Sequence, residues 1–126
     1  MIEELVDRLF EQEAAIREDL RNNPPRSYDD LVKRLVGYLA DVDTVSGQLD
    51  PKRIHVIDDG EYQGTRLFIV GAQGYQPRTY WSIFVNYGSC SVCDTFQAAR
   101  ELDDEFARID DYWSLMLHMV QQLAQV

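Results

Sequence analysis

Cysteine, histidine and long apolar runs are scarce in this sequence, and each shortage excludes something. The chain has 126 residues and two cysteines, and a chain of this length buries roughly two-thirds of the surface that it exposes when unfolded. It therefore needs neither a disulfide framework nor a structural metal to fold. The longest apolar runs fall far short of the roughly 20 residues that span a bilayer, so we expect no contact with a membrane.

We expect no basic, apolar leader either. The chain begins Met-Ile-Glu-Glu-Leu, whereas a secretory signal begins with basic residues and continues with an apolar stretch. We therefore expect a cytoplasmic protein.

Positive charge is in short supply. Twelve basic residues stand against twenty-two acidic ones, which gives a net charge of −10. Contacts with phosphates supply most of the affinity of nucleic-acid-binding proteins, so this balance excludes general binding to nucleic acid. A local pocket for a small anion stays compatible with it, and the negative field favours solubility and basic partners.

The composition is that of one globular domain spanning residues 1–126. Apolar residues make up 45% of the chain and charged residues 27%, close to the average of folded domains. No repeat, linker or low-complexity stretch divides the chain.

Helical periodicity dominates the first third of the chain. Apolar spacing from Ile2 to Asn22 predicts one helix, which Pro24 and Pro25 end because neither can continue the hydrogen-bond ladder. Ser27 is a good N-cap, and the apolar period that follows it predicts a second helix reaching Val42.

The pattern then changes to strands and back to helix. Three strands are predicted, over Arg53–Ile57, Thr65–Val70 and Arg78–Tyr87, and their short connections favour an antiparallel meander. Helical spacing resumes over Phe96–Leu123, as one helix or as two broken near Asp103–Asp104, and no later strand is predicted. The predicted fold is α+β, with two N-terminal helices, a three-stranded antiparallel sheet and one or two C-terminal helices packed on one sheet face.

The turn from Cys90 to Cys93 is the most pointed chemical feature. Ser91 can cap a helix with Asp94 three residues on, and a helix N-terminus there would stabilise a thiolate. A strand, a CxxC pair and a helix are also the arrangement of thioredoxin-type oxidoreductases. Those proteins usually carry Gly-Pro between the cysteines, whereas Ser-Val lies there in this chain and all four prolines come earlier. Thiol redox chemistry is therefore an alternative function.

Zinc is a second use of the same cysteines. Cys90 and Cys93 supply two of the four ligands of a tetrahedral site, and the rest must come from elsewhere. The histidines, His55 and His118, are isolated from each other and from the cysteines, so a site shared between two subunits would need two CxxC turns. A zinc-stabilised module and a turn with two buried structural thiols both stay open.

The backbone of this turn offers a third alternative. Gly88, Ser89 and Ser91 precede a predicted helix, where free N–H groups and hydroxyls can bind an anion. Arg66 and Arg78 on neighbouring strands could supply the positive charge. A small anionic ligand such as a nucleotide would suit this site.

Aromatic residues in turns support the leading hypothesis. Tyr62 and Tyr75 lie in predicted turns, where together with Tyr87 and Asp94 they could form a contact surface. No Ser/His/Asp order, P-loop or HExxH motif is found. We therefore expect a non-enzymatic protein that binds a protein partner, with homodimer formation as a further option.

Two motifs carry a resemblance to a known group. The segments Tyr62-Gln-Gly-Thr65 and Tyr87-Gly-Ser-Cys-Ser-Val-Cys-Asp-Thr95 resemble motifs of small uncharacterised proteins of tailed bacteriophages and prophages. The likeness covers roughly Ile54–Ala99 and leaves the flanking helical regions unassigned. It implies a small phage-encoded accessory protein acting in the bacterial cytoplasm, and it implies no particular activity.

Overall fold

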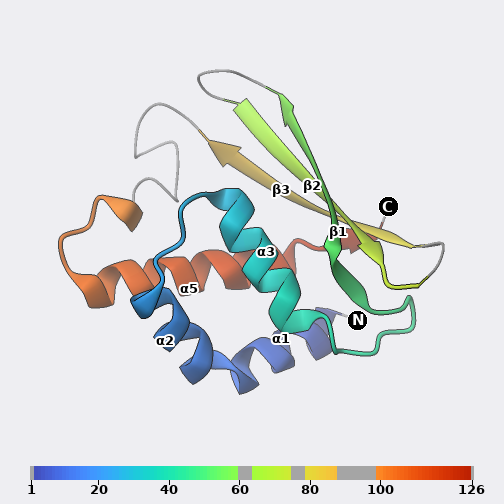
Figure 1. Ribbon diagram of the computed structural model, residues 1–126, viewed down its shortest axis with the longest axis horizontal. Helices are drawn as coiled ribbons and strands as arrows, with labels where there is room; N and C mark the ends of the chain where they lie inside the picture. Colours follow the sequence, from blue (N-terminus) through green and yellow to red (C-terminus); the bar gives the residue numbers. More distant parts are fainter. Residues whose placement is uncertain (1, 60–63, 75–78, 88–98, 126) are drawn as a thin grey trace.

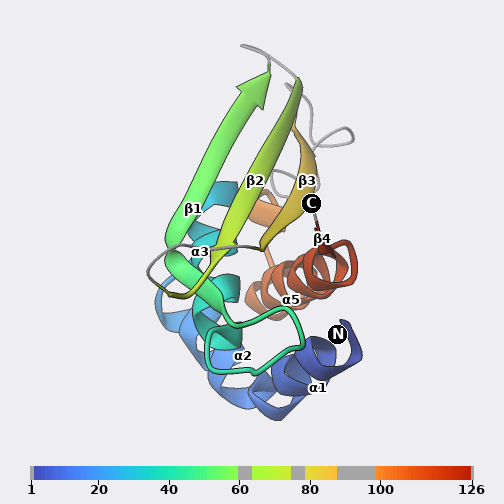
Figure 2. The same cartoon turned by 90° about the vertical axis from the view of Figure 1, so that its right-hand side faces the viewer.

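The described part of the chain is a layer of helices against one antiparallel sheet. The computed structural model describes residues 2–59, 64–74, 79–87 and 99–125 (Figure 1), and all structural statements below concern these residues. Figures 1 and 2 show the helices gathered on one side of the sheet, which confirms the predicted α+β class.

The first helical region consists of two helices where one was predicted. Helix α1 spans Ile2–Glu11 and α2 spans Glu13–Asn22, and the chain turns between them at Gln12. Both helices bury leucine or isoleucine on a common stripe, but position 12 and its neighbour are polar. The turn coincides with this gap in the apolar stripe, so each half keeps its apolar side chains in the core.

Helix α3 confirms the second predicted helix. It spans Tyr28–Leu39, and the Ser27 hydroxyl accepts a hydrogen bond from the Asp30 N–H at 3.2 Å, as an N-cap does. The helix ends at Leu39, three residues before the predicted end at Val42.

The sheet contains the predicted meander and one additional strand. Strands β1 (Leu49–Asp59), β2 (Gly64–Ala72) and β3 (Tyr80–Tyr87) pair in sequence order, all antiparallel. Strand β4 (Ala124–Gln125) pairs with β3, so the prediction of three strands was wrong in number, as was the absence of a strand after the cysteines. A strand of two residues has no periodic pattern in the sequence and gains its place through pairing with β3.

Strand β1 begins with an irregular segment. Its register against β2 shifts between Leu49 and Ile54, and the Asp50 carboxylate accepts a hydrogen bond from the Lys52 N–H at 2.9 Å across Pro51. Regular pairing runs from Ile54 to Asp59. The irregular segment therefore interrupts the first half of this edge strand, before Ile54. The second half, from Ile54 to Asp59, pairs regularly.

The last helix begins just after Asp103–Asp104, where the sequence left open whether one helix continues or two are separated. Helix α5 spans Glu105–Gln121, and the Asp104 side chain caps it by accepting a hydrogen bond from the Phe106 N–H at 3.1 Å. Residues 99 and 100 are helical, and a non-helical connection separates them from α5. The C-terminal region is therefore broken near Asp103–Asp104.

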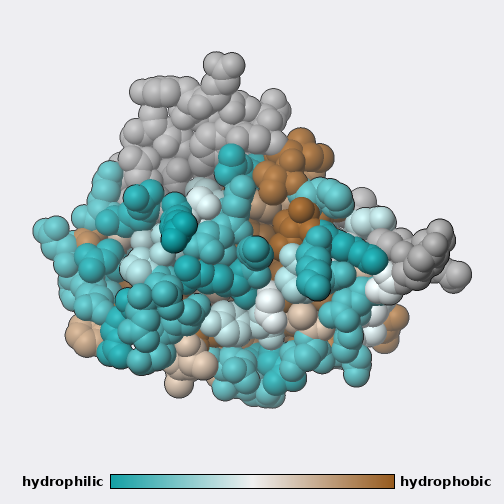
Figure 3. All heavy atoms as spheres, in the orientation of Figure 1, coloured by the Kyte–Doolittle hydropathy of each residue, from teal (hydrophilic) through white to brown (hydrophobic). Residues whose placement is uncertain are grey.

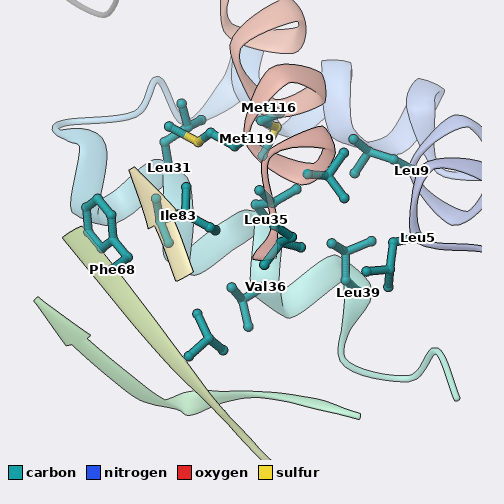
Figure 4. Close-up of a cluster of buried hydrophobic side chains, with 14 of the residues drawn as sticks. Leu5, Leu9, Leu31, Leu35, Val36, Leu39, Phe68, Ile83, Met116 and Met119 are labelled. Atoms are coloured by element: carbon teal, nitrogen blue, oxygen red, sulfur yellow. The ribbon is translucent and has the colours of Figure 1, made fainter. Parts of the chain in front are cut away.

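The core lies between the sheet and the helices α1, α2, α3 and α5. Phe68 of β2 and Ile83 of β3 lie in one cluster with Leu35 of α3 and Met116 of α5 (Figure 4). These four side chains are fully buried. Since alternate strand residues face opposite sides, the sheet buries one face and leaves the other uncovered by any described helix.

Candidate functional site

Most of the residues predicted to form a site lie outside the described ranges. These are Tyr62, Tyr75, Arg78, Gly88, Ser89, Cys90, Ser91, Cys93 and Asp94. The backbone of Tyr87 ends β3 opposite Gly64, but its side chain is not among those described. The thiol, zinc and anion-turn hypotheses therefore stay predictions.

Arg66 is the predicted site residue whose side chain is described. It lies on β2, and its Nη1 donates a hydrogen bond to Oδ1 of Asp29 at 2.6 Å. Asp29 belongs to the first turn of α3, so the pair ties this helix to the sheet. The structure thus gives Arg66 a contact between two elements, and its role towards an anion stays a prediction.

A groove runs between α3 and β1, on the helix side of the sheet. Its volume is about 350 Å³, within the range of small-ligand and peptide pockets. Figure 3 shows hydrophobic surface on the face of the molecule where α3 and β1 lie. The floor is apolar and the rim is polar, and together they consist of Asp29, Lys33, Pro51, Lys52, Ile54, Val56 and Phe68.

The two lysines on this rim are the only lysines of the chain. Lys33 comes from α3 and Lys52 from the irregular start of β1, and both are exposed. Within the described residues neither ammonium group forms a hydrogen bond or an ion pair, whereas Arg17 and Arg34 each bind two carboxylates. The groove therefore combines an apolar floor with two cations that no described carboxylate neutralises.

Strand β1 is an edge of the sheet, and its second half carries exposed side chains on both faces. Val56 lines the groove and is 41% exposed, while Ile57 points to the opposite face and is 55% exposed. Natural edge strands are usually shortened, charged or covered, because free N–H and C=O groups invite pairing with another strand. The irregular segment at Pro51 hinders pairing with another strand only along the first half of β1.

The uncovered face of the sheet adds an apolar row to this edge. The pairing register places Ile57 beside Leu67, and Leu67 beside Phe84, which is 54% exposed. The next row consists of His55, Ile69 and Ser82. None of the six side chains in these two rows is acidic, in a protein with a net charge of −10.

A second, polar hollow at the corner of α2 and α3 has a volume of about 640 Å³. Arg34 lines it together with Asp30, but Arg34 already pairs with Asp30 at 3.0 Å and with Asp19 at 3.5 Å. Asp30 also accepts the N–H of Arg26 at 3.1 Å. Arg34 and Asp30 thus neutralise each other, and Lys33 borders this hollow as well as the groove.

The titratable groups with shifted pKa values lie away from the groove. Burial, with the nearby charge and hydrogen bond of Asp19, raises the pKa of Tyr38 to about 12. Burial also raises the pKa of Tyr112 on α5. In the described part of the chain no three His, Cys, Asp or Glu side chains come close enough to hold a metal ion.

Comparisons with known proteins gave no match: no family model, no curated protein and no solved structure is significantly similar to this chain. None of the helices in the described ranges has the length and apolar character to cross a bilayer.

The strand over Arg53–Ile57 was predicted, but neither its exposed edge nor the groove was recognised as a candidate site, although one signal was present. The consecutive Val56 and Ile57 make both faces of the strand apolar, which is typical of a strand buried on both sides. The first strand of a meander is an edge, where such a pattern leaves apolar side chains in water. The conflict between the two inferences is the signal of an interface. Lys33 gave no such signal, since a lysine on a helix is ordinary.

Proposed function

We propose that the protein is a non-enzymatic binding protein whose partner is another protein, and that edge strand β1 makes the contact. The observation that carries this proposal is the exposure of Val56 and Ile57, two neighbouring apolar residues on opposite faces of an edge strand. A partner that covers β1 would bury both side chains and also satisfy the free backbone groups between them.

The uncovered sheet face extends this surface. Ile57, Leu67 and Phe84 lie in one row across three strands. A contiguous apolar patch on an otherwise charged protein is typical of a contact surface. The partner would therefore approach from the β1 side and cover part of the outer face.

The setting that we propose is the cytoplasm of a bacterium, with the protein as a phage-type accessory factor. The likeness of the Tyr62–Thr65 and Tyr87–Thr95 segments to phage and prophage proteins supports this setting. The partner is then a host or phage protein.

Site-specific photocrosslinking tests the proposal. A photoreactive amino acid replaces Ile57 in one variant and Val45 in a second, since Val45 is 98% exposed but lies on the connection between α3 and β1. In bacterial cytoplasm we expect a discrete adduct from position 57 that position 45 does not give. Mass spectrometry identifies the adduct, and the purified partner should bind the unmodified protein directly.

The substitution Ile57→Asp provides the second arm. Ile57 is exposed, so the fold is retained, and we expect affinity for the purified partner to fall at least about tenfold. The proposal is wrong if position 57 gives no specific adduct, or if Ile57→Asp leaves the affinity unchanged.

A further inference from the structure

The groove lies on the helix side of the same edge that the proposed partner would cover. A strand added to β1 would lie about 4.8 Å from it, and its side chains would alternate between the groove and the outer sheet face. On the groove side they would reach Ile54 and Val56. The edge of β1 thus supplies backbone hydrogen-bond partners, and the groove contacts every second side chain of the added strand.

The charges of the rim favour one chemistry for that strand. Lys33 and Lys52 border the apolar floor, and neither is neutralised by a described residue. Asp29, the acidic group on this rim, is engaged by Arg66. An occupant with carboxylates that reach Lys33 and Lys52 and with apolar side chains on the groove floor complements this pattern, whereas a basic one leaves the two lysines facing like charges.

We propose that the free edge of β1 binds one extended, acidic segment of the partner protein as an additional strand. Carboxylates of the segment meet Lys33 and Lys52, and its groove-facing apolar side chains pack on Ile54 and Val56. This inference rests on the proposed function, since it describes the part of the partner that β1 binds.

The dimensions of the edge fit a short segment. Regular pairing covers Ile54–Asp59, and strands rise about 3.3 Å per residue, so the edge accommodates a segment of about six residues. At the start of β1, Pro51 lacks an N–H and the register shifts, so pairing with an added strand would stop there. Lys52 therefore stands where the added strand would end.

A second copy of this chain is a less favourable occupant. Each copy carries a net charge of −10, and bringing two together against one edge opposes that repulsion. An acidic segment also meets the negative field of the protein, but a short segment brings far less charge than a whole chain. The two lysines then distinguish this edge from the rest of the surface.

Selection from a library of random twelve-residue peptides tests the inference on the full chain. We expect enriched peptides to carry valine or isoleucine at alternate central positions, with acidic residues flanking them. The best peptide is synthesised, and its affinity is measured for the unmodified protein and for the variants Lys33→Glu and Lys52→Glu. Each variant should weaken binding at least about fivefold, and added salt should weaken binding to the unmodified protein.

Two controls separate the groove from general charge and from small-anion binding. Arg21→Glu makes the same charge change on α2, outside the groove, and should leave the affinity within about twofold. A peptide with one N-methylated central residue keeps its carboxylates but loses a strand hydrogen bond, and should bind at least about tenfold more weakly.

Several outcomes overturn the inference. They are enrichment of basic or helical peptides, no enrichment at all, equal effects of Arg21→Glu and the lysine variants, or full affinity of the N-methylated peptide. A lysine variant that changes the oligomeric state of the protein alone would assign the edge to a second copy instead. If the partner crosslinked at position 57 binds both lysine variants normally, this inference fails while the proposed function stands.

Discussion

At the scale of single residues, Trp113 joins the helices on the side away from the sheet. Its ring meets the Phe10 ring edge-on at 5.8 Å, and the Arg17 guanidinium lies 5.5 Å from its centroid. Arg17 also binds Asp110 at 2.5 Å, and this hydrogen bond raises the pKa of the guanidinium. One indole thus contacts side chains from both α1 and α2.

Truncation of this indole should destabilise the protein strongly. Trp113 is 5% exposed, and we expect Trp113→Ala to lower the free energy of unfolding by about 3 to 5 kcal/mol. Arg17→Ala should lower it by about 1 kcal/mol or less, because the pair with Asp110 is partly exposed. Urea unfolding measures both, with Arg21→Ala as the exposed control on α2. Similar losses for Arg17→Ala and Trp113→Ala would contradict this account of the packing.

Tyr38 makes the free energy of unfolding depend on pH in the alkaline range. Its hydroxyl donates a hydrogen bond to Asp19 at 3.1 Å, and burial together with that carboxylate raises its pKa from 10.0 to about 12. Between these two pH values the unfolded chain has lost the phenolic proton and the folded chain still holds it. Stability is therefore complete below pH 10 and falls as the pH rises towards 12.

The variant Tyr38→Phe isolates this effect. At pH 8 it should be less stable by about 1 kcal/mol, since it loses the hydrogen bond to Asp19. As the pH rises from 10 to 12, the difference in unfolding free energy between the variant and the unmodified protein should shrink. The reason is that only the unmodified protein, which has the ionisable tyrosine, loses stability over this range. Urea unfolding at several pH values measures this, and a difference that is constant or grows with pH would show that Tyr38 is not the group responsible.

At the scale of elements, the cap of α3 controls the helix that carries Lys33. The Ser27 hydroxyl accepts the N–H of Asp30, and the Asp30 carboxylate binds Arg34 one turn later. We expect Ser27→Ala to lower the free energy of unfolding by about 1 kcal/mol and Ser27→Asp to restore most of it. Thermal unfolding measures both. Equal stability of the alanine and aspartate variants would mean that the cap contributes little.

The elements also show how far the sequence predicts the fold. The apolar period after Ser27 predicts α3 closely, because an N-cap and an uninterrupted stripe agree there. The turn at Gln12 was missed, because no proline or glycine marks it and the apolar stripe resumes beyond it. Strand β4 was missed because two residues carry no pattern, and its position depends on β3 far away in the sequence.

The groove was less predictable than either helix. Lys33 and Lys52 lie 19 positions apart in the sequence, and the packing of α3 beside β1 brings both to one rim. Ile54 and Val56 were predicted as strand residues, but their partial exposure follows from the edge position of β1. Tertiary arrangement, which single-sequence patterns do not encode, thus creates the candidate site.

At the scale of the whole molecule, the distribution of charge and of apolar surface defines one unusual region. The helices bury one face of the sheet, and the opposite face presents Ile57, Leu67 and Phe84 to solvent. Around the edge from this row, the groove presents Lys33 and Lys52, the only lysines of an acidic chain. Both surfaces meet at β1, so a partner that covers β1 contacts both.

Amide hydrogen exchange, measured with and without the purified partner crosslinked at position 57, tests this account most directly. In the free protein, the β1 amides that point away from β2 have no partner strand among the described residues, and we expect them to exchange fast. We predict that the partner slows exchange in residues 54–57, with smaller effects in β2 and in the first turns of α3. Unchanged exchange in residues 54–57, with protection confined to α1, α2 or α5, would contradict the assignment of β1 as the binding edge.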